Sequence, residues 1–173
     1  MSTDITIRDA YPNEFQSIGD LMVSVYSSLD GFPSPKEQPD YYHFLQHIGD
    51  ITEKSNTRLL VAVDAVNALA GAVVYIGDMQ HYGSGGTATM EKDAAGFRLL
   101  AVSPDFRGRK IGKVLTEKCI SLASVSGLKH MIIHTTEAMQ TAWGMYERMG
   151  FKRALDLDFE QKGFPVFGFR LVL

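Results

Sequence analysis

The segment from Leu99 to Gly112, LLAVSPDFRGRKIG, constrains this chain more than any other segment. It predicts an apolar strand, a Ser-Pro turn and a basic, glycine-containing loop that leads directly into an amphipathic helix. The first N–H groups of a helix have no hydrogen-bond partner inside the helix, so they are free to bind a group at the helix start. Arg107, Arg109 and Lys110 stand beside them in the sequence. The segment therefore predicts a site for an anion, and a pyrophosphate fits this description best.

Two well-known phosphate loops do not fit the sequence. The Walker A loop places four residues between its glycines and then Lys and a hydroxyl residue, but Gly108 and Gly112 enclose three residues and Lys113 is followed by Val114. A dinucleotide-binding fingerprint needs spaced glycines between a strand and a helix. The GSGG segment at 83–86 precedes no helical pattern, so we expect it to be a flexible loop tip. A protein that binds ATP or GTP through the basic loop is therefore a rival interpretation that lacks the Walker residues.

The same loop resembles that of the GNAT superfamily of N-acyltransferases, which runs Arg or Gln, two residues, Gly, one residue, then Gly or Ala. Arg107 and Gly112 match its first and last marked places, and Lys110 replaces the middle glycine. Lys110 can still present its backbone N–H if its φ and ψ angles are helical, and it adds charge near a phosphate. The segment Ala142–Phe151, AWGMYERMGF, resembles the fourth helix of that family. The two motifs occur in the family's order, which makes the resemblance specific.

Composition is that of one globular domain, which we expect to span residues 1–173. The chain is 45% hydrophobic, which is enough to bury a substantial core, and its formal net charge of −3 argues against a nucleic-acid partner. The single cysteine, Cys119, cannot form an intramolecular disulfide, and no apolar segment has the length of a signal peptide or a membrane span. We therefore expect a cytoplasmic protein with no membrane partner.

Hydrophobic periodicity predicts the order β-α-α-β-β-β-α-β-α-β-β, a mixed α/β sandwich with about four helices. This is also the order of elements in the GNAT fold, and the resemblance implies that the central sheet is largely antiparallel. Residues 77–95 are polar, glycine-rich and unpatterned, so we expect a long mobile loop there. The expected strands are 5–8, 59–63, 68–76, 96–102, 129–135, 151–159 and 166–173, and the expected helices are 13–29, 41–51, one from the basic loop to Ser126, and 138–149.

The resemblance implies a cofactor site for acetyl-CoA, used as a co-substrate. The pantetheine arm would pair with the backbone of Leu100, Ala101 and Val102. Met139 stands where many members of the family have an asparagine that contacts the cofactor, so that contact is absent here. N–H groups and a helix start can neutralise a pyrophosphate without a metal, so we expect none. The residues implied to surround the pyrophosphate are Arg107, Gly108, Arg109, Lys110, Ile111, Gly112 and Lys113.

The resemblance also implies a general acid, because Tyr146 occupies the place of the family's tyrosine that protonates the departing thiolate. A phenol with a pKa of about 10 is protonated at neutral pH and suits this role, although a core tyrosine is the structural alternative. The general base is less clear. Some members of the family carry a glutamate where Gly96 stands here, and the substitutes are Glu91, Asp93, Glu137 or a water relay.

Arg98 is the one charged residue in its apolar strand. Simple alternation places its side chain on the same side as Gly96, Leu100 and Val102. A buried charge needs a partner, and we expect a protein carboxylate rather than an anionic part of the substrate.

Other reactive side chains carry no expected function. His43 and His47 share a helix face without a third metal ligand, and Cys119 lies on the apolar face of its helix, where a core role is expected.

These observations predict an N-acetyltransferase that moves the acetyl group of acetyl-CoA to a primary amine by direct attack. The alternative on the same fold is a non-catalytic acyl-CoA-binding or sensing module. The acceptor, a small molecule or a peptide amine, is not encoded in the loops 31–39, 77–95 and 163–166 that would surround it, and the turn at 31–35 is either a pocket wall or a plain connector. The C-terminal strands often mediate pairing in the family, so the resemblance allows a homodimer.

Overall fold

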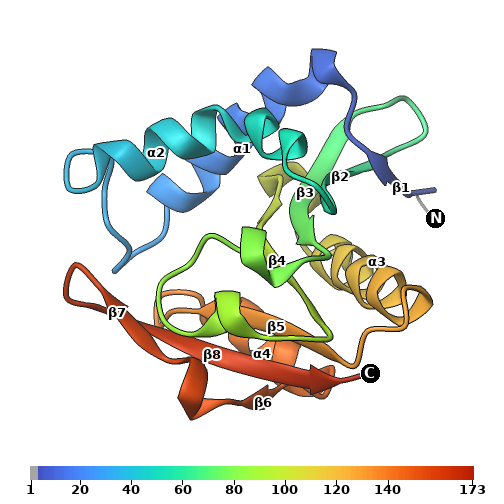
Figure 1. The fold of residues 1–173 in the computed structure, drawn as a ribbon. Helices are drawn as coiled ribbons and strands as arrows, with labels where there is room; N and C mark the ends of the chain where they lie inside the picture. The colour runs from blue at the N-terminus through green and yellow to red at the C-terminus, as the bar shows by residue number, and fades with distance from the viewer. Residues whose placement is uncertain (1–3) are drawn as a thin grey trace.

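A central sheet with helices on both faces organises the computed structural model, which describes residues 4–173 (Figure 1). The strand order is β1-β2-β3-β4-β5-β8-β6, and β7 pairs with β8. All neighbouring strands are antiparallel except β4 and β5. The strands are β1 (Thr6–Asp9), β2 (Thr57–Val63), β3 (Leu69–Ile76), β4 (Ala94–Val102), β5 (His130–Thr135), β6 (Lys152–Arg153), β7 (Phe159–Gln161) and β8 (Phe164–Val172).

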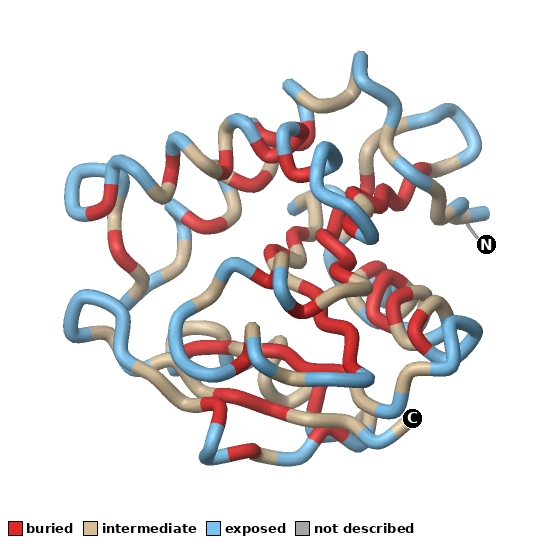
Figure 2. Tube along the Cα trace, in the orientation of Figure 1, coloured by how far each residue is buried: buried red, intermediate tan, exposed pale blue. Residues whose placement is uncertain are grey.

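The helices divide the core into two layers, one on each face of the sheet. Residues from α1 and α2 pack on one face, and residues from α3 and α4 pack on the other. Figure 2 shows the buried segments along the central strands and the inner faces of the helices. The helices are α1 (Phe15–Ser27), α2 (Pro39–Gln46), α3 (Ile111–Val125) and α4 (Gln140–Arg148), and the 3-10 turns are η1 (Pro12–Glu14), η2 (Ile48–Glu53), η3 (Met79–His81), η4 (Ala88–Met90), η5 (Pro104–Phe106) and η6 (Leu155–Leu157).

The predicted α/β class and the mostly antiparallel sheet are confirmed, but the second helix is shorter than expected. It leaves the α-helical conformation at His47 (φ −105°, ψ 32°) and continues as η2. Gly49 lies against the ring of Phe15, where an added Cβ would come within 2.3 Å of Cδ2. The contact between η2 and α1 therefore decides the local conformation, which hydrophobic spacing alone could not show.

The prediction of one strand over 151–159 is wrong, because the chain folds inward between β6 and β7. Arg153 and Asp158 form a salt bridge of 2.7 Å, and Asp158 also accepts the backbone N–H of Gly168. These bonds enclose η6 and bury Leu157 completely. Alternation of polar and apolar residues in this segment thus reflects a tight turn instead of a continuous strand.

The segment 77–95 is more structured than expected for an unpatterned loop. It forms η3 and η4 and buries Met79, Tyr82 and Ala88 in the core under α1 and α2. Its GSGG portion packs on Phe159, because a Cβ at Gly85 would come within 2.9 Å of that ring. The glycines therefore allow close packing, and the expectation of a free loop tip is wrong.

Strand β4 contains a β-bulge that decides where its side chains point. Leu99 and Leu100 lie opposite the single residue Val73, and Leu99 has a φ of 60°. Arg98 and Leu99 therefore both face α1 and α2, whereas Leu100 and Val102 face α3 and α4. The expectation that Arg98 shares a side with Leu100 and Val102 is wrong, since a bulge reverses the alternation.

Strands β4 and β5 pair only at their first three residues, from Ala94 opposite His130 to Gly96 opposite Ile132. Both strands continue beyond this point without pairing to each other. Their remaining residues line a pocket that opens between them. The fold therefore leaves a gap at the centre of the sheet.

We predict that Gly96→Ala destabilises the protein by about 1–3 kcal/mol, the usual cost of overpacking a dense core. A Cβ at Gly96 would lie 2.6 Å from the ring of Tyr82 and 2.9 Å from the carbonyl oxygen of Ile132. The free energy of unfolding in urea measures the effect. Gly144→Ala in α4 is the control, because its Cβ would meet only the mobile end of Arg148 and alanine favours a helix. Equal stability of both variants would contradict the prediction.

Candidate functional site

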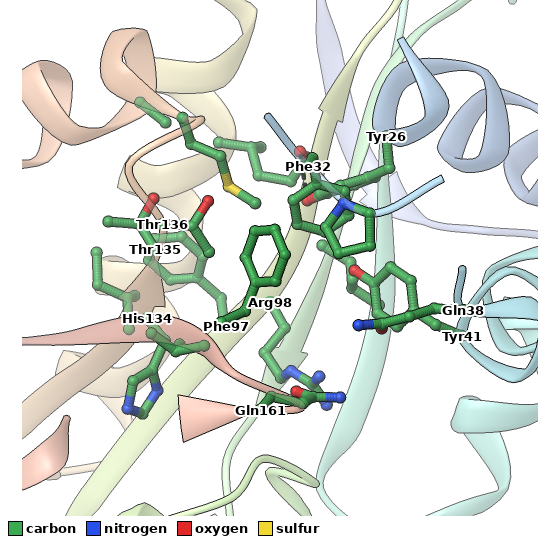
Figure 3. A pocket seen from close by; sticks show the side chains of 18 of the residues that line it. Tyr26, Phe32, Gln38, Tyr41, Phe97, Arg98, His134, Thr135, Thr136 and Gln161 are labelled. Atoms are coloured by element: carbon green, nitrogen blue, oxygen red, sulfur yellow. Dashed lines mark hydrogen bonds between the residues drawn. The ribbon is translucent and has the colours of Figure 1, made fainter. Parts of the chain in front are cut away.

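A pocket of about 150 Å³ occupies the gap between β4 and β5 (Figure 3). One wall comes from β4 and β5, a second from α1 and the turn before α2, and a third from α4 and the segment around β7. The turn at Phe32 and Pro33 contributes to the second wall, so the pocket-wall interpretation of this turn is confirmed. The lining residues are Tyr26, Phe32, Pro33, Gln38, Tyr41, Phe97, Arg98, Leu99, Leu100, Ile133, His134, Thr135, Thr136, Met139, Ala142, Tyr146, Gln161, Phe164 and Val166.

Tyr146 lies in this pocket on α4, with its ring packed against Phe97 and Phe151 at centroid distances of 5.7 Å each. The side chain is 5% exposed, and burial raises the pKa of its phenol above the usual value. Its hydroxyl makes no hydrogen bond to residues 4–173 and is not fully enclosed. The phenol is therefore buried in the core, yet its hydroxyl has no protein partner among the described residues and is not fully enclosed.

The basic loop presents an uninterrupted series of free N–H groups. None of the six backbone N–H groups from Gly108 to Lys113 donates to an acceptor within residues 4–173, and the first bonded one is Val114 to the carbonyl of Lys110 (3.1 Å). Arg107, Arg109 and Lys110 are exposed beside them. Such a concentration of donors at a helix start is suited to a phosphate.

Lys110 does not adopt a right-handed helical conformation. Its φ of 62° and ψ of 23° place it in the left-handed region, which favours glycine. The turn between η5 and α3 imposes this conformation on whichever residue stands there. Lys110 therefore does not meet the condition of right-handed helical angles, although its N–H still belongs to the free series.

The backbone of Leu100, Ala101 and Val102 forms the edge of β4 next to the gap. The N–H of Ser103 donates to the carbonyl of Ala70 (2.8 Å), and Ala101 is opposite Ala72. Antiparallel pairs alternate in their bonding, so the N–H and carbonyl of Val102 point away from β3. The carbonyl of Leu100 accepts the hydroxyl of Tyr26 (3.1 Å). This edge can therefore still pair with an extended ligand.

The basic loop reaches the pocket through Gly112. A Cβ at Gly112 would lie 3.7 Å from Leu100, Val102 and Met145, which is ordinary contact. Leu100 also lines the pocket. The free N–H groups, the edge of β4 and Tyr146 are therefore brought together, as the resemblance implied.

Two threonines on the opposite side of the pocket lack partners. The hydroxyl oxygens of Thr135 and Thr136 are buried and make no hydrogen bond to the described part of the chain. A buried hydroxyl without a partner is unfavourable, so both are suited to a ligand in the pocket. The sequence signals neither residue, because only the separation of β4 and β5 distinguishes them from core threonines.

Arg98 has no carboxylate partner among residues 4–173. Its Nη1 donates to the carbonyl of Tyr82 (2.9 Å), and its guanidinium lies 5.7 Å from the centre of the Tyr82 ring. The expectation of a protein carboxylate is therefore wrong. A backbone carbonyl satisfies part of the guanidinium, and the rest of the side chain lines the pocket.

His134 lines the same pocket, and sequence reasoning did not select it. Its Nε2 lies 2.8 Å from the carbonyl of Leu157, which can only accept, so Nε2 carries the proton and Nδ1 accepts the hydroxyl of Tyr82 (3.0 Å). Burial lowers the pKa of His134 and favours the neutral ring. Both ring nitrogens are therefore engaged.

None of the three carboxylates considered as a base lines the main pocket. Glu91 forms a salt bridge with Arg170, and Asp93 is exposed at the start of β4, where its carbonyl accepts the N–H of Lys129. Glu137 is exposed and borders a smaller neighbouring pocket. The ring of Tyr82 fills the space beside Gly96 where other members of the resembled family would carry a glutamate.

The remaining reactive side chains considered from the sequence are Cys119, His43 and His47. Cys119 is fully buried on α3, and burial raises the pKa of its thiol, which confirms the core role. His43 and His47 are exposed with ring centres 4.2 Å apart.

Residues 4–173 contain no group of three or more His, Cys, Asp or Glu placed to hold a metal. No helix in this range is long and apolar enough to cross a membrane.

We predict that Lys110→Gly raises the free energy of unfolding by about 0.5–1 kcal/mol. The left-handed conformation costs a lysine about 1–2 kcal/mol, and the greater entropy of glycine in the unfolded chain offsets part of the gain. Urea denaturation measures the change. Lys113→Gly is the control, since it lies within the first turn of α3 and glycine there costs up to about 1 kcal/mol. A loss of stability in Lys110→Gly would contradict the prediction.

Comparisons with known proteins agree on one family. A model described as the acetyltransferase (GNAT) family matches residues 22–151. An uncharacterized N-acetyltransferase of Dictyostelium discoideum is 38% identical over 52 residues, a match that covers 30% of this chain and 24% of that relative.

Two solved structures share the fold along nearly the whole chain. An acetyltransferase of the GNAT family from Staphylococcus aureus has a TM-score of 0.74 at 17% identity, with 98% of this chain and 99% of that chain covered. PaiA N-acetyltransferase from Thermoplasma acidophilum, solved in complex with coenzyme A, has a TM-score of 0.72 at 14% identity, with 95% and 98% covered. The family match over three quarters of the sequence and the shared fold lead to one conclusion: this chain belongs to the acetyltransferase (GNAT) family.

Proposed function

We propose that this chain is an N-acetyltransferase that moves the acetyl group of acetyl-CoA to a primary amine by direct attack. The observation that carries the proposal is the junction of three features at one pocket: six consecutive free N–H groups at the start of α3, the unpaired edge of β4, and the buried hydroxyl of Tyr146. The N–H groups suit the pyrophosphate of an acyl-CoA, and the edge of β4 suits its pantetheine arm. The hydroxyl of Tyr146 suits proton donation in the chemical step.

The residues present fit coenzyme A. The free N–H groups from Gly108 to Lys113 would hold the pyrophosphate, with Arg107, Arg109 and Lys110 adding charge without a metal. The edge of β4 at Leu100–Val102 would pair with the amides of the pantetheine arm. The coenzyme A complex of PaiA N-acetyltransferase supports this assignment, because the two chains share a fold.

Tyr146 would act as the general acid. Amide formation expels a thiolate, which needs a proton. Tyr146 brings a phenol from α4 into the pocket, and its hydroxyl donates to no acceptor among residues 4–173. Burial raises the pKa of Tyr146, so its proton is present throughout the neutral range. No covalent enzyme intermediate is required.

A water molecule would receive the proton of the attacking amine. No carboxylate lines the main pocket, and both nitrogens of His134 are engaged in hydrogen bonds. An amine must lose its proton before it attacks, so the rate should rise with pH towards the pKa of the acceptor amine. Because the pKa of Tyr146 is raised, loss of its proton should not lower the rate in that range.

We predict that Tyr146→Phe lowers kcat for acetyl transfer by about 10²- to 10⁴-fold, the usual contribution of a general acid, and leaves the Kd of acetyl-CoA within about threefold. Steady-state kinetics of thiol release and titration calorimetry measure the two quantities. Tyr75→Phe is the matched control, because Tyr75 is a buried tyrosine of the same core layer that does not line the pocket. Equal rates for the two variants would assign Tyr146 to packing alone.

We predict that Gly112→Asp abolishes micromolar binding of acetyl-CoA without loss of stability. The added carboxylate would repel the pyrophosphate, yet an acidic residue in the first turn of a helix is favourable by about 0.3–1 kcal/mol. Gly112→Ala is the control, because its Cβ makes only ordinary contacts at 3.7 Å.

The same calorimetric titration separates the proposal from its rivals. Acetyl-CoA is compared with adenosine bisphosphate and with ATP and magnesium. Binding of ATP alone would contradict the proposal and favour a nucleotide-binding protein. Binding of acetyl-CoA with no acetylation of any amine would favour a non-catalytic acyl-CoA-binding module.

A further inference from the structure

We propose that the acceptor amine carries a carboxylate and that Arg98 binds it. This inference rests on the proposed acetyl transfer and names the class of acceptor that the same pocket selects. The acceptor would be a small amine with an anionic group, such as an amino acid, in preference to a neutral amine or a polyamine.

Arg98 is positioned as a binding group by the register of β4 on β3. It lies opposite Val74, before the bulge at Leu99, and faces α1 and α2, on the opposite face of the sheet from the basic loop. Its Nη1 donates to the carbonyl of Tyr82 (2.9 Å), which holds the guanidinium in place. The absence of a side chain at Gly83 leaves room for it, since a Cβ there would lie 3.0 Å from Nη1. Because the basic loop is on the other face, Arg98 is not the site of the pyrophosphate.

The charge of Arg98 lacks an anion in the part of the chain that the structure describes. No Asp or Glu lies within salt-bridge distance, and a neutral carbonyl compensates the desolvation of a half-buried guanidinium only in part. The planar guanidinium offers five N–H donors in a geometry that suits a carboxylate. A ligand carboxylate would therefore complete the site.

The rest of this end of the pocket favours an anion as well. Gln161, Gln38 and Tyr41 line the same pocket as Arg98 (Figure 3). These amide and hydroxyl groups can donate hydrogen bonds, and Tyr41 keeps its proton because burial raises its pKa to about 12.

The charge of the lining also disfavours polycations. The lining residues among 4–173 include no Asp or Glu, and burial favours the neutral ring of His134, so Arg98 is the one formal charge among them. A polyamine would meet a positive charge with no carboxylate to bind it.

Acetylation of matched acceptors tests the inference. L-Phenylalanine is compared with L-phenylalaninamide, and L-alanine with L-alaninamide, with kcat/KM expressed per unprotonated amine at saturating acetyl-CoA; spermidine is the polycationic acceptor. We expect the carboxylate form to be favoured by about 10- to 100-fold, the range of a charge-assisted bidentate bond. A ratio near one, or preference for spermidine, would overturn the inference.

The variant Arg98→Gln should bring this ratio close to one, and Arg98→Lys should restore part of it. A merely structural role of Arg98 at the carbonyl of Tyr82 would lower both members of a pair equally and leave the ratio unchanged. Arg58→Gln is the matched control, because Arg58 pairs with Asp9 on the surface and does not line the pocket. If Arg98→Gln does not fold, the wild-type ratio still decides the question.

Binding of products separates this inference from the proposed function. N-Acetyl-L-phenylalanine and its amide are titrated into the wild type and Arg98→Gln without acetyl-CoA. Preferential binding of the carboxylate that is lost in the variant supports the Arg98 site, even where no amine is acetylated and the proposed function fails. Acetylation of amines with no carboxylate preference in either assay overturns this inference and leaves the proposed function intact.

Discussion

The separation of β4 from β5 is the constraint on which the rest of the site depends. The two strands are parallel and pair over three residues, so their ladder cannot close the sheet beyond Gly96 and Ile132. Backbone groups at the centre of a sheet are normally paired, because leaving them buried without partners is costly. The open edge of β4 and the unpaired hydroxyls of Thr135 and Thr136, at least among the described residues, are therefore suited to hydrogen bonds with a ligand in this gap.

The bulge at Leu99 assigns different chemistry to the two faces of the sheet. Before the bulge, Arg98 faces the side of α1 and α2, and after it Leu100 and Val102 face the side of α3 and α4. The basic loop and Tyr146 lie on the second side, whereas the polar residues around Arg98 lie on the first. The geometry thus keeps the proposed phosphate site on one face of the sheet and the proposed acceptor site on the other, and the pocket lies between them.

Burial decides the protonation states in the pocket. The phenol of Tyr146 and the ring of His134 both stay neutral near pH 7, because low polarity raises the pKa of an acid and lowers that of a base. His134 also satisfies Tyr82 and the carbonyl of Leu157, which removes it from acid-base chemistry. Among the described residues no carboxylate lines the pocket, so Arg98 is the main charge there and is the feature on which the proposed acceptor specificity rests.

The sequence by itself determined the order of elements as far as α4, the basic loop at the start of α3 and the place of Tyr146, because these depend on local spacing and on a glycine-containing turn. Only the tertiary structure decided the direction of Arg98, the left-handed conformation of Lys110 and the inward turn at Leu157. The direction of Arg98 depends on the register of β4 on β3, and the turn at Leu157 depends on the bond from Gly168 to Asp158. The conformation of Lys110 depends on the geometry of the junction between η5 and α3, which hydrophobic spacing does not report. Thr135, Thr136 and His134 carry no local signal, since their importance arises from a gap that exists only after the sheet has formed.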